Sequence, residues 1–136
     1  MFITLGFYKR RPDISREDFS CHWREIHGPL LRNTPSISRY LRRYVQHHLT
    51  PGVGFNNVMP LDCDGFSEAW FDTMQDRQAM HAEKEFQERV IPDEATFIDM
   101  SATRFLMFDN HRKSLACHRN DRQQCLSEKG QSLRRE

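Results

Sequence analysis

The stretch from Phe7 to Leu31 most constrains the fold, because FYKRRPDISREDFSCHWREIHGPLL contains a strand end, a turn and a complete amphipathic helix. Pro12-Asp13 breaks the chain. Ser15 is a favourable N-cap with Asp18 three residues later, which is a weak form of the capping box. Apolar residues then recur at helical spacing, at Phe19, Trp23, Ile26 and Leu30. We therefore predict a helix that packs this stripe against the core.

The sequence His27-Gly28-Pro29 marks the expected end of this helix. Proline lacks an amide hydrogen and disfavours helical geometry in the residue before it, so Gly28-Pro29 predicts an interruption and an end near Leu31. We expect His27 at the edge between core and solvent, where the helix dipole favours a protonated imidazole. From the residues alone, His27 is either an acid/base group or a helix-terminal histidine bonded to a free carbonyl.

The rest of the chain alternates strand and helix patterns. Strands are predicted over residues 1–9, 39–49, 66–71 and 102–108, where β-formers alternate with polar residues. A second helix is predicted over residues 72–90, with a stop at Ile91-Pro92. The resulting order, β-α-β-β-α-β, is that of an α+β, ferredoxin-like fold. Helices on one face leave the other face of the sheet to be covered, which predicts a homodimer.

Composition and charge exclude several classes of protein. The chain has 136 residues, 38% of them hydrophobic, which suits one domain over residues 1–110. No stretch approaches the roughly 20 apolar residues of a membrane span, and the first residues do not predict a signal peptide. Residues 1–110 hold 13 basic and 16 acidic residues, so we expect no nucleic-acid partner. Residues 111–136 hold 7 basic and 3 acidic residues and predict a disordered basic tail.

The cysteines predict neither a metal centre nor a disulfide framework. They form no CxxC pair and have no zinc spacing with histidine, at Cys21, Cys63, Cys117 and Cys125. A reducing, cytoplasmic location fits them best. The chain also lacks GxGxxG and GxxxxGK[ST]. We therefore predict no cofactor and no metal, with chemistry restricted to proton transfers and eliminations by side chains.

One acidic candidate lies on the predicted strand over residues 66–71. Glu68 and Trp70 share a face of this strand. A glutamate between aromatic neighbours is either a buried acid with a raised pKa or the ion-pair partner of Arg42 or Arg104 across the sheet. Both interpretations stay open.

The remaining candidates are scattered along the sequence. Asp93 is most simply the N-cap of a short helical turn after Ile91-Pro92. Tyr8, Tyr40 and Tyr44 could donate phenolic protons to a substrate carbonyl, although core tyrosines bonded to the backbone are as common. His48 lies on a polar, aromatic-lined strand face that suits a pocket.

Four segments resemble the EthD family of dimeric α/β barrel proteins: the stretch quoted above, then RYLRRYVQHH, DGFSEAWF and PDEATFID. They cover residues 2–109 in order. The resemblance implies a ferredoxin-like subunit and a homodimer whose two sheets face each other in a barrel. Related barrels include cofactor-independent isomerases, cyclases and monooxygenases. Fungal EthD-like proteins are associated with aromatic polyketide pathways as decarboxylases or dehydratases.

The resemblance also implies roles for individual residues. His27-Gly28-Pro29 matches the family's most recognisable motif, so His27 is the expected general acid/base, while Asp93 and Phe97 match the PDE…F segment. A tyrosine or Glu68 would hold an enol, and Trp70 and Phe97 would form apolar walls. The expected function is a cofactor-independent lyase acting on an aromatic, polyketide-like molecule in secondary metabolism. The alternatives are a non-catalytic dimeric carrier of hydrophobic metabolites and a cofactor-free isomerase or monooxygenase.

Overall fold

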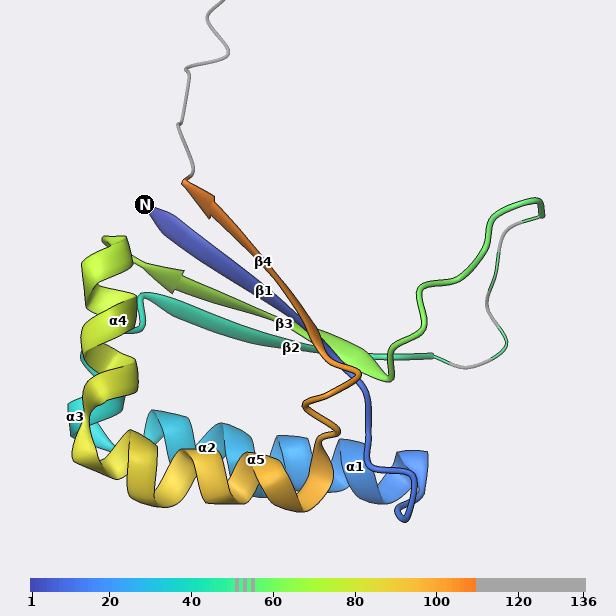
Figure 1. The fold of residues 1–136 in the computed structure, drawn as a ribbon, viewed down its shortest axis with the longest axis horizontal. Coiled ribbons are helices and arrows are strands. Elements are labelled where there is room, and N and C mark those ends of the chain that lie inside the picture. The colour runs from blue at the N-terminus through green and yellow to red at the C-terminus, as the bar shows by residue number, and fades with distance from the viewer. Residues whose placement is uncertain (51, 53, 55, 110–136) are drawn as a thin grey trace, which may run out of the picture.

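Four strands form one antiparallel sheet with the helices on one of its faces (Figure 1). The computed structural model describes residues 1–109 except 51, 53 and 55, so the predicted tail lies outside the described residues. The sheet order is β2-β3-β1-β4, with β1 (Phe2–Tyr8), β2 (Arg43–His48), β3 (Gly65–Phe71) and β4 (Arg104–Asp109). This is the split β-α-β arrangement of the predicted ferredoxin-like α+β fold, which is thereby confirmed.

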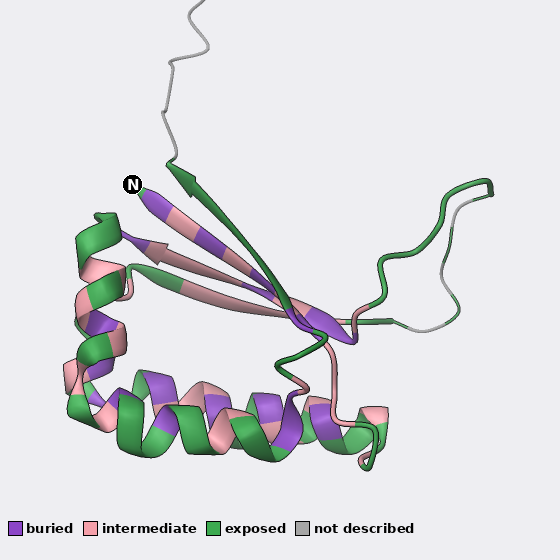
Figure 2. Cartoon of the chain, viewed as in Figure 1, coloured by how far each residue is buried: buried purple, intermediate pink, exposed green. Residues whose placement is uncertain are grey.

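Side chains alternate between the two faces of the sheet, as the two-residue period of a strand requires. In β1 the even-numbered residues are buried and the odd-numbered ones are half-buried (Figure 2). The register pairs Thr4 with Ala69 and Gly6 with Ser67, so these residues face the helices. The opposite face, which we call the open face, carries the odd-numbered residues of β1 and their even-numbered partners on β3, such as Leu5 and Glu68. No helix of the described residues lies against the open face (Figure 1).

The first helical layer is continuous, in contrast to the predicted interruption. It consists of α1 (Arg16–His22), a single π-helical turn η1 (Trp23–His27) and α2 (Gly28–Arg32). Ser15 caps α1 by accepting a hydrogen bond from the amide of Asp18 at 3.0 Å, as its position predicted. The prediction of a break at Gly28-Pro29 is wrong, because η1 widens the helix ahead of the proline. There the amide of Gly28 donates to the carbonyl of Trp23, five residues earlier.

This π turn changes which residues enter the core. Phe19 and Trp23 are buried as predicted, but Ile26 is 53% exposed and His27 only 4%. A π turn holds one extra residue, so every later side chain is rotated by about 100° from its expected direction. The buried stripe therefore continues through His27 and Leu31, and the predicted place of His27 at the solvent edge is wrong.

The second helical layer also contains a π turn. After the short α3 (Pro35–Ser38), it consists of α4 (Met74–Ala82) and, beyond Glu83, of a π turn η2 (Phe86–Val90) that continues into α5 (Ile91–Phe97). The single helix predicted over residues 72–90 is therefore interrupted, because the backbone of Glu83 is extended, with φ −61° and ψ 140°. Thr73 begins α4 in a reciprocal capping box with Asp76. The predicted stop at Ile91-Pro92 is wrong for the same reason as the first, since Pro92 follows a π turn and the helix continues. Asp93 consequently lies inside a helical segment and is not its N-cap.

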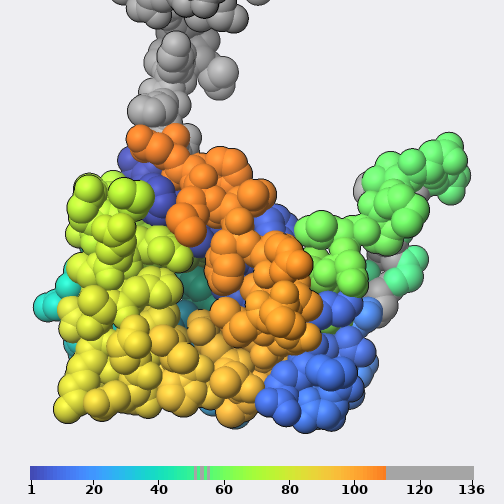
Figure 3. All heavy atoms as spheres, viewed as in Figure 1, coloured from blue at the N-terminus to red at the C-terminus, as the bar shows by residue number. Residues whose placement is uncertain are grey.

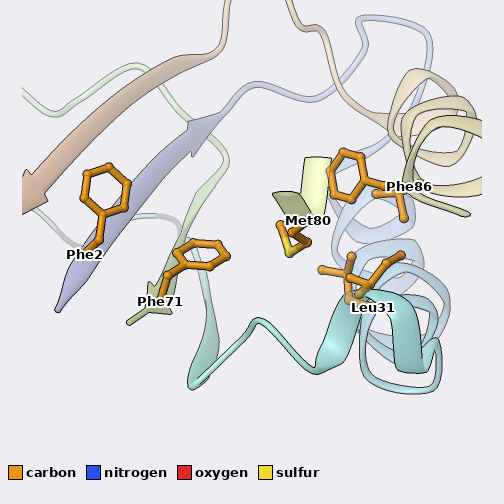
Figure 4. Packing of buried hydrophobic residues seen from close by; sticks show 7 residues of the cluster. Phe2, Leu31, Phe71, Met80 and Phe86 are labelled. Carbon is orange, nitrogen blue, oxygen red and sulfur yellow. The ribbon is translucent and has the colours of Figure 1, made fainter. Parts of the chain in front are cut away.

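The core lies between the sheet and the helices. Figure 4 shows Phe2 and Phe71 from the strands facing Met80, Phe86 and Leu31 from the helices. A second cluster consists of Tyr8, Phe19, Trp23, Phe97 and Ile98. Each large side chain buried in this way contributes about 1.5–3 kcal/mol relative to exposure. Within the described part of the chain, no helix is both long and apolar enough to cross a membrane.

Candidate active site

A cavity of about 350 Å³ lies between the helix-facing side of the sheet and the helices. Figure 3 shows a hollow between α4 and β4, where the surface opens toward the interior. Most of its walls are apolar, from Leu31, Leu41, Phe71, Met80, Phe86 and Phe105. Its polar lining comes from the side chains Thr4, Tyr8, His27, Tyr44, Ser67, Arg77, His81 and Glu94. An apolar cavity with a few convergent polar groups is the usual form of a small-molecule site.

The histidine of this cavity is held by a partly buried carboxylate. His27 Nδ1 lies 2.8 Å from Asp93 Oδ2, and His22 Nε2 lies 2.8 Å from Asp93 Oδ1. The first π turn ends at His27 and the second ends three residues before Asp93, so the two helical layers meet at this pair. Since Nδ1 is bound to Asp93, the nitrogen of His27 left for a substrate is Nε2.

The environment of Asp93 favours its ionised form. Burial raises the pKa of the Asp93 carboxyl, but hydrogen bonds from His27 and His22, together with their charges, outweigh burial and lower it overall. An ionised carboxylate beside an imidazole fixes the tautomer and the ring orientation, and it stabilises the imidazolium that forms when the ring accepts a proton. The pair is thus arranged for proton transfer.

Phe97 positions both histidine rings. It is 1% exposed, with its ring centroid 4.5 Å from that of His22 and 5.4 Å from that of His27. Phe97 is absent from the lining of the cavity, so it supports the rings from behind rather than forming the predicted wall.

A second carboxyl in the cavity has the opposite tendency to Asp93. Burial raises the pKa of Glu94, the charge of His27 lowers it, and that of Asp93 raises it, with a net increase. A carboxyl of raised pKa keeps its proton at a higher pH and can act as a donor. Adjacent carboxyl groups whose pKa values are pushed in opposite directions are typical of acid/base sites.

Two phenol groups complete the polar lining. The Tyr8 hydroxyl lies 3.0 Å from Ser67 Oγ, and burial raises its pKa. The Tyr44 hydroxyl accepts a hydrogen bond from Trp23 Nε1 at 3.2 Å, and burial raises its pKa to about 12. Both phenols therefore stay protonated at neutral pH and are able to donate a hydrogen bond to an oxygen of a ligand.

Glu68 and Trp70 lie away from this cavity, on the open face of the sheet. Glu68 accepts a hydrogen bond from Trp70 Nε1 at 3.1 Å, and its other oxygen lies 3.0 Å from His47 Nε2. The hydrogen bond from Trp70 is the main reason that the pKa of Glu68 is lowered. Both predicted interpretations of Glu68 are therefore wrong: its pKa is not raised, and its partner is His47 rather than Arg42 or Arg104.

Two further predicted residues also lie outside the lining of the cavity. The Tyr40 hydroxyl donates to Glu83 at 2.8 Å, where the carboxylate also binds Arg39. The imidazole of His48 faces the helices but is 2.6 Å from Ser20 Oγ and packs against Trp23, which separates it from the cavity. Of the predicted residues, the structure thus brings together His27, Asp93, Phe97 and Tyr8.

Sequence reasoning missed several residues of this site. His22 was not among the predicted site residues, yet it binds Asp93. Glu94 had one available signal, its position next to Asp93 in the PDE segment. Arg77 had none, because an arginine on an amphipathic helix is normally solvated.

Comparisons with known proteins agree with this architecture. The sequence profile of the EthD domain matches residues 11–101. A solved EthD family protein from Bacillus halodurans is 18% identical, with a TM-score of 0.60 over 82% of this chain and 100% of its own. A dimeric protein of unknown function and ferredoxin-like fold from Bacteroides fragilis is 12% identical, with a TM-score of 0.58 over 80% and 95%. A putative antibiotic biosynthesis monooxygenase from Nitrosomonas europaea is 13% identical, with a TM-score of 0.53 over 82% and 100%. No curated protein matches the sequence.

Proposed function

This chain belongs to the EthD domain family, and we propose that it is a cofactor-independent lyase that removes water or carbon dioxide from an aromatic, polyketide-like molecule. One observation carries the proposal: His27 lines an apolar cavity while Asp93 holds its Nδ1 at 2.8 Å. The ring is thereby fixed with Nε2 available to a bound substrate. Imidazole is the side chain best suited to both accept and donate a proton near neutral pH.

In a dehydration, His27 Nε2 removes the proton from the carbon next to a substrate carbonyl. The electron pair of that C–H bond moves into the carbonyl as an enolate, and a protonated phenol of Tyr8 or Tyr44 donates a hydrogen bond to the enolate oxygen. Collapse of the enolate forms a C=C bond as the C–O bond to the β-hydroxyl breaks. The hydroxyl leaves as water after taking a proton from Glu94, which is regenerated by exchange with the imidazolium.

In a decarboxylation, the bond between the substrate carboxylate and its α-carbon breaks and carbon dioxide leaves. The electron pair again moves into the neighbouring carbonyl, and the imidazolium of His27 then protonates the α-carbon. Both reactions use the same groups, and general acid/base assistance of this kind is typically worth about 10²–10⁴-fold in rate.

The polar lining favours an enzyme over a passive carrier. A carrier of hydrophobic metabolites needs only apolar walls, whereas this cavity also presents Tyr8, Ser67, Arg77 and Glu94 alongside His27. Placing ionisable groups against an apolar cavity lowers stability. Their presence here therefore supports a functional use.

We also propose that a second copy of the chain covers the open face of the sheet. Leu106 and Phe108 on β4 are 50% and 46% exposed, and Phe66 and Trp70 on β3 share that face with them. The structurally similar protein from Bacteroides fragilis is described as dimeric, which supports this proposal. Light scattering of the purified protein tests it: a mass of two chains is expected, and a monomer at micromolar concentration would contradict it.

The activity is tested with wild-type protein and His27→Asn on a panel of aromatic β-keto acids and β-hydroxy ketones. Products are followed by mass, for loss of carbon dioxide or of water. Turnover by the wild type that falls at least about 10²-fold in the variant supports the proposal. Binding of the compounds by both proteins without turnover would favour a carrier, and oxygen consumption with substrate alone would favour a monooxygenase.

A further inference from the structure

Arg77 and Thr4 are polar groups of the cavity that have no partner within the described part of the chain. Arg77 makes no ion pair and no side-chain hydrogen bond there, and the buried Thr4 Oγ1 makes no hydrogen bond. Thr4 is 5% exposed, and Arg77 is half-buried. Burying a polar group without a partner costs about 1–3 kcal/mol. That both such groups line one cavity indicates that a ligand supplies their partners.

The acidic residues nearest to Arg77 in the sequence are already engaged elsewhere. Asp72 binds Arg42, and Asp76 accepts from Thr73 in the capping box at the start of α4. Glu83, beyond the end of α4, binds Arg39. Glu94, the carboxyl of the cavity itself, forms no ion pair with Arg77, so Arg77 is a positive charge of this cavity that no carboxylate of the described residues pairs with.

The surroundings of Arg77 keep this charge directed at the cavity. Burial lowers the pKa of Arg77, but an arginine side chain remains protonated under all physiological conditions. Its neighbour on α4, His81, has its pKa lowered to about 4 by burial and by the charge of Arg77, so the imidazole is neutral. The charge of Arg77 also acts on the Tyr8 hydroxyl across the cavity. A ligand thus meets the fixed cation of Arg77 beside protonated phenols, and the same cavity holds Glu94, a carboxyl whose pKa burial raises.

Resting on the proposed lyase function, we propose that Arg77, assisted by the hydroxyl of Thr4, binds a carboxylate of the substrate, which is therefore an aromatic acid. A planar guanidinium pairs with a planar carboxylate through two parallel hydrogen bonds, and this geometry selects carboxylates over neutral isosteres. Thr4 and Arg77 reach the cavity from different layers, β1 and α4, so they contact the acid from two sides.

This placement also discriminates between the two proposed reactions. An ion pair with Arg77 stabilises a carboxylate in the ground state and is weakened as carbon dioxide forms, so it opposes loss of the bound group. The carboxylate at Arg77 is then retained in the product, while His27 transfers the proton elsewhere on the molecule. The inference therefore selects dehydration of an aromatic acid over decarboxylation of the anchored group.

The test compares the binding of two isosteric probes, 2,4-dihydroxybenzoate and 2,4-dihydroxybenzamide, by calorimetry. We expect the wild type to bind the acid at least tenfold more tightly than the amide, as one charged pair contributes at least about 1.4 kcal/mol. In Arg77→Met this preference should disappear through loss of acid binding alone. Arg77→Lys should restore part of it, and Thr4→Val should weaken acid binding without lowering thermal stability.

The matched control is Arg89→Met, since Arg89 is an exposed arginine of η2 outside the lining of the cavity. It should retain the preference of the wild type. Equal binding of acid and amide by the wild type, binding of neither probe, or equal loss of both probes in Arg77→Met would overturn the proposal. Tighter binding of phenyl phosphate than of benzoate would overturn its assignment to a carboxylate.

The variant His27→Asn separates this inference from the proposed function. It should keep the preference for the acid while losing turnover. A protein that shows turnover dependent on His27 without the acid preference contradicts the carboxylate site alone. A protein that shows the preference without any turnover contradicts the lyase and leaves an acid-binding protein.

Discussion

Among the described residues, the histidine–carboxylate pairs His27–Asp93 and His47–Glu68 have similar geometry but different surroundings. His27 and Asp93 lie 2.8 Å apart between the helices and the cavity, with 5% and 13% of their side chains exposed. His47 and Glu68 lie 3.0 Å apart on the open face, with 38% and 24% exposed. In both pairs the pKa of the carboxyl is lowered, in Asp93 against burial and in Glu68 mainly by Trp70.

The difference shows that pairing alone does not create an acid/base site. The ring of His47 lies flat on Phe66, with centroids 4.1 Å apart and planes 10° apart, and His47 does not line the cavity that His27 borders. His27 instead borders an apolar cavity, where electrostatic interactions are stronger than in water. The second pair is thus a natural internal control for the first.

The largest expected effect separates the two pairs directly. His27→Asn and Asp93→Asn should each lower turnover by about 10²–10⁴-fold, because they remove the proton acceptor or leave its ring unoriented. His47→Gln and Glu68→Gln should change turnover less than about twofold at equal protein stability. Steady-state rates with circular dichroism as the folding control measure this. An equal loss of turnover in both pairs would show that the position beside the cavity does not distinguish His27 and Asp93 from His47 and Glu68.

The next largest effect concerns Glu94, the cavity carboxyl next to Asp93 in the sequence. Glu94→Gln should lower turnover at least about tenfold, since the amide does not supply a proton. Burial raises the pKa of Glu94, so the wild-type rate should decline with rising pH as this group ionises, starting above the ordinary range of glutamate near pH 4.5. The variant should lack that decline. A pH–rate profile of identical shape in both proteins would show that Glu94 is not the donor.

A smaller effect is expected on stability. The folded-state pKa of Asp93 is below its ordinary value of 3.8, so its contribution is present above that value and is lost as pH falls through the folded-state pKa. Asp93→Asn should lower the unfolding free energy by about 1–3 kcal/mol at neutral pH, because it weakens two partly buried hydrogen bonds. It should also flatten the dependence of stability on pH below about 4. Urea unfolding from pH 7 to pH 2 measures both.

Glu68→Gln is the matched control for this measurement. The sign of its contribution is the same, because the pKa of Glu68 is also lowered, but exposure to solvent screens it. At protein concentrations too low for the proposed dimer to form, we expect a shallower change than for Asp93→Asn over the same pH range. A steeper change under those conditions would contradict the solvent screening of Glu68.

The smallest expected effect concerns the contact between Gly28, at the start of α2, and Gln46 on β2. A Cβ at Gly28 would lie 3.0 Å from Gln46 Nε2, which itself donates to the Trp23 carbonyl at 2.8 Å. Gly28→Ala should therefore lower stability by up to about 1 kcal/mol, against the usual preference of helices for alanine. In a Gln46→Ala background the same substitution should raise stability by about 0.5–1 kcal/mol. If the double-mutant cycle shows no such change of sign, the contact with Gln46 is not the cause of the destabilisation.

The sequence allowed the order of strands and the start of the first helix to be predicted, because both depend on local signals. Alternation of β-formers predicted the strands, and Ser15 with Asp18 predicted the cap that the structure contains. The continuity of the helices was not predictable in this way. Gly28-Pro29 and Ile91-Pro92 are strong local stop signals, and each is accommodated by a π turn that tertiary packing stabilises.

The site was predictable only where a motif carried it. His27 and Asp93 came from the resemblance, but their pairing depends on two helical layers whose contact no local pattern encodes. Glu68 and Trp70 share a strand face, as the two-residue period required, yet the period does not say which face meets the helices. The role of Arg77 was not predictable for a related reason. It depends on the lack of an ion-pair partner in the folded chain, which the sequence pattern does not encode.

The paired π turns have a consequence for redesign. Each is equivalent to a one-residue insertion in a helix, so the relation between His27 and Asp93 depends on chain length as well as on side-chain identity. Grafting the two residues onto straight helices of the same axis would rotate both away from the contact by about 100°. A transplanted dyad must therefore carry the irregular turns with it, or begin from a different spacing.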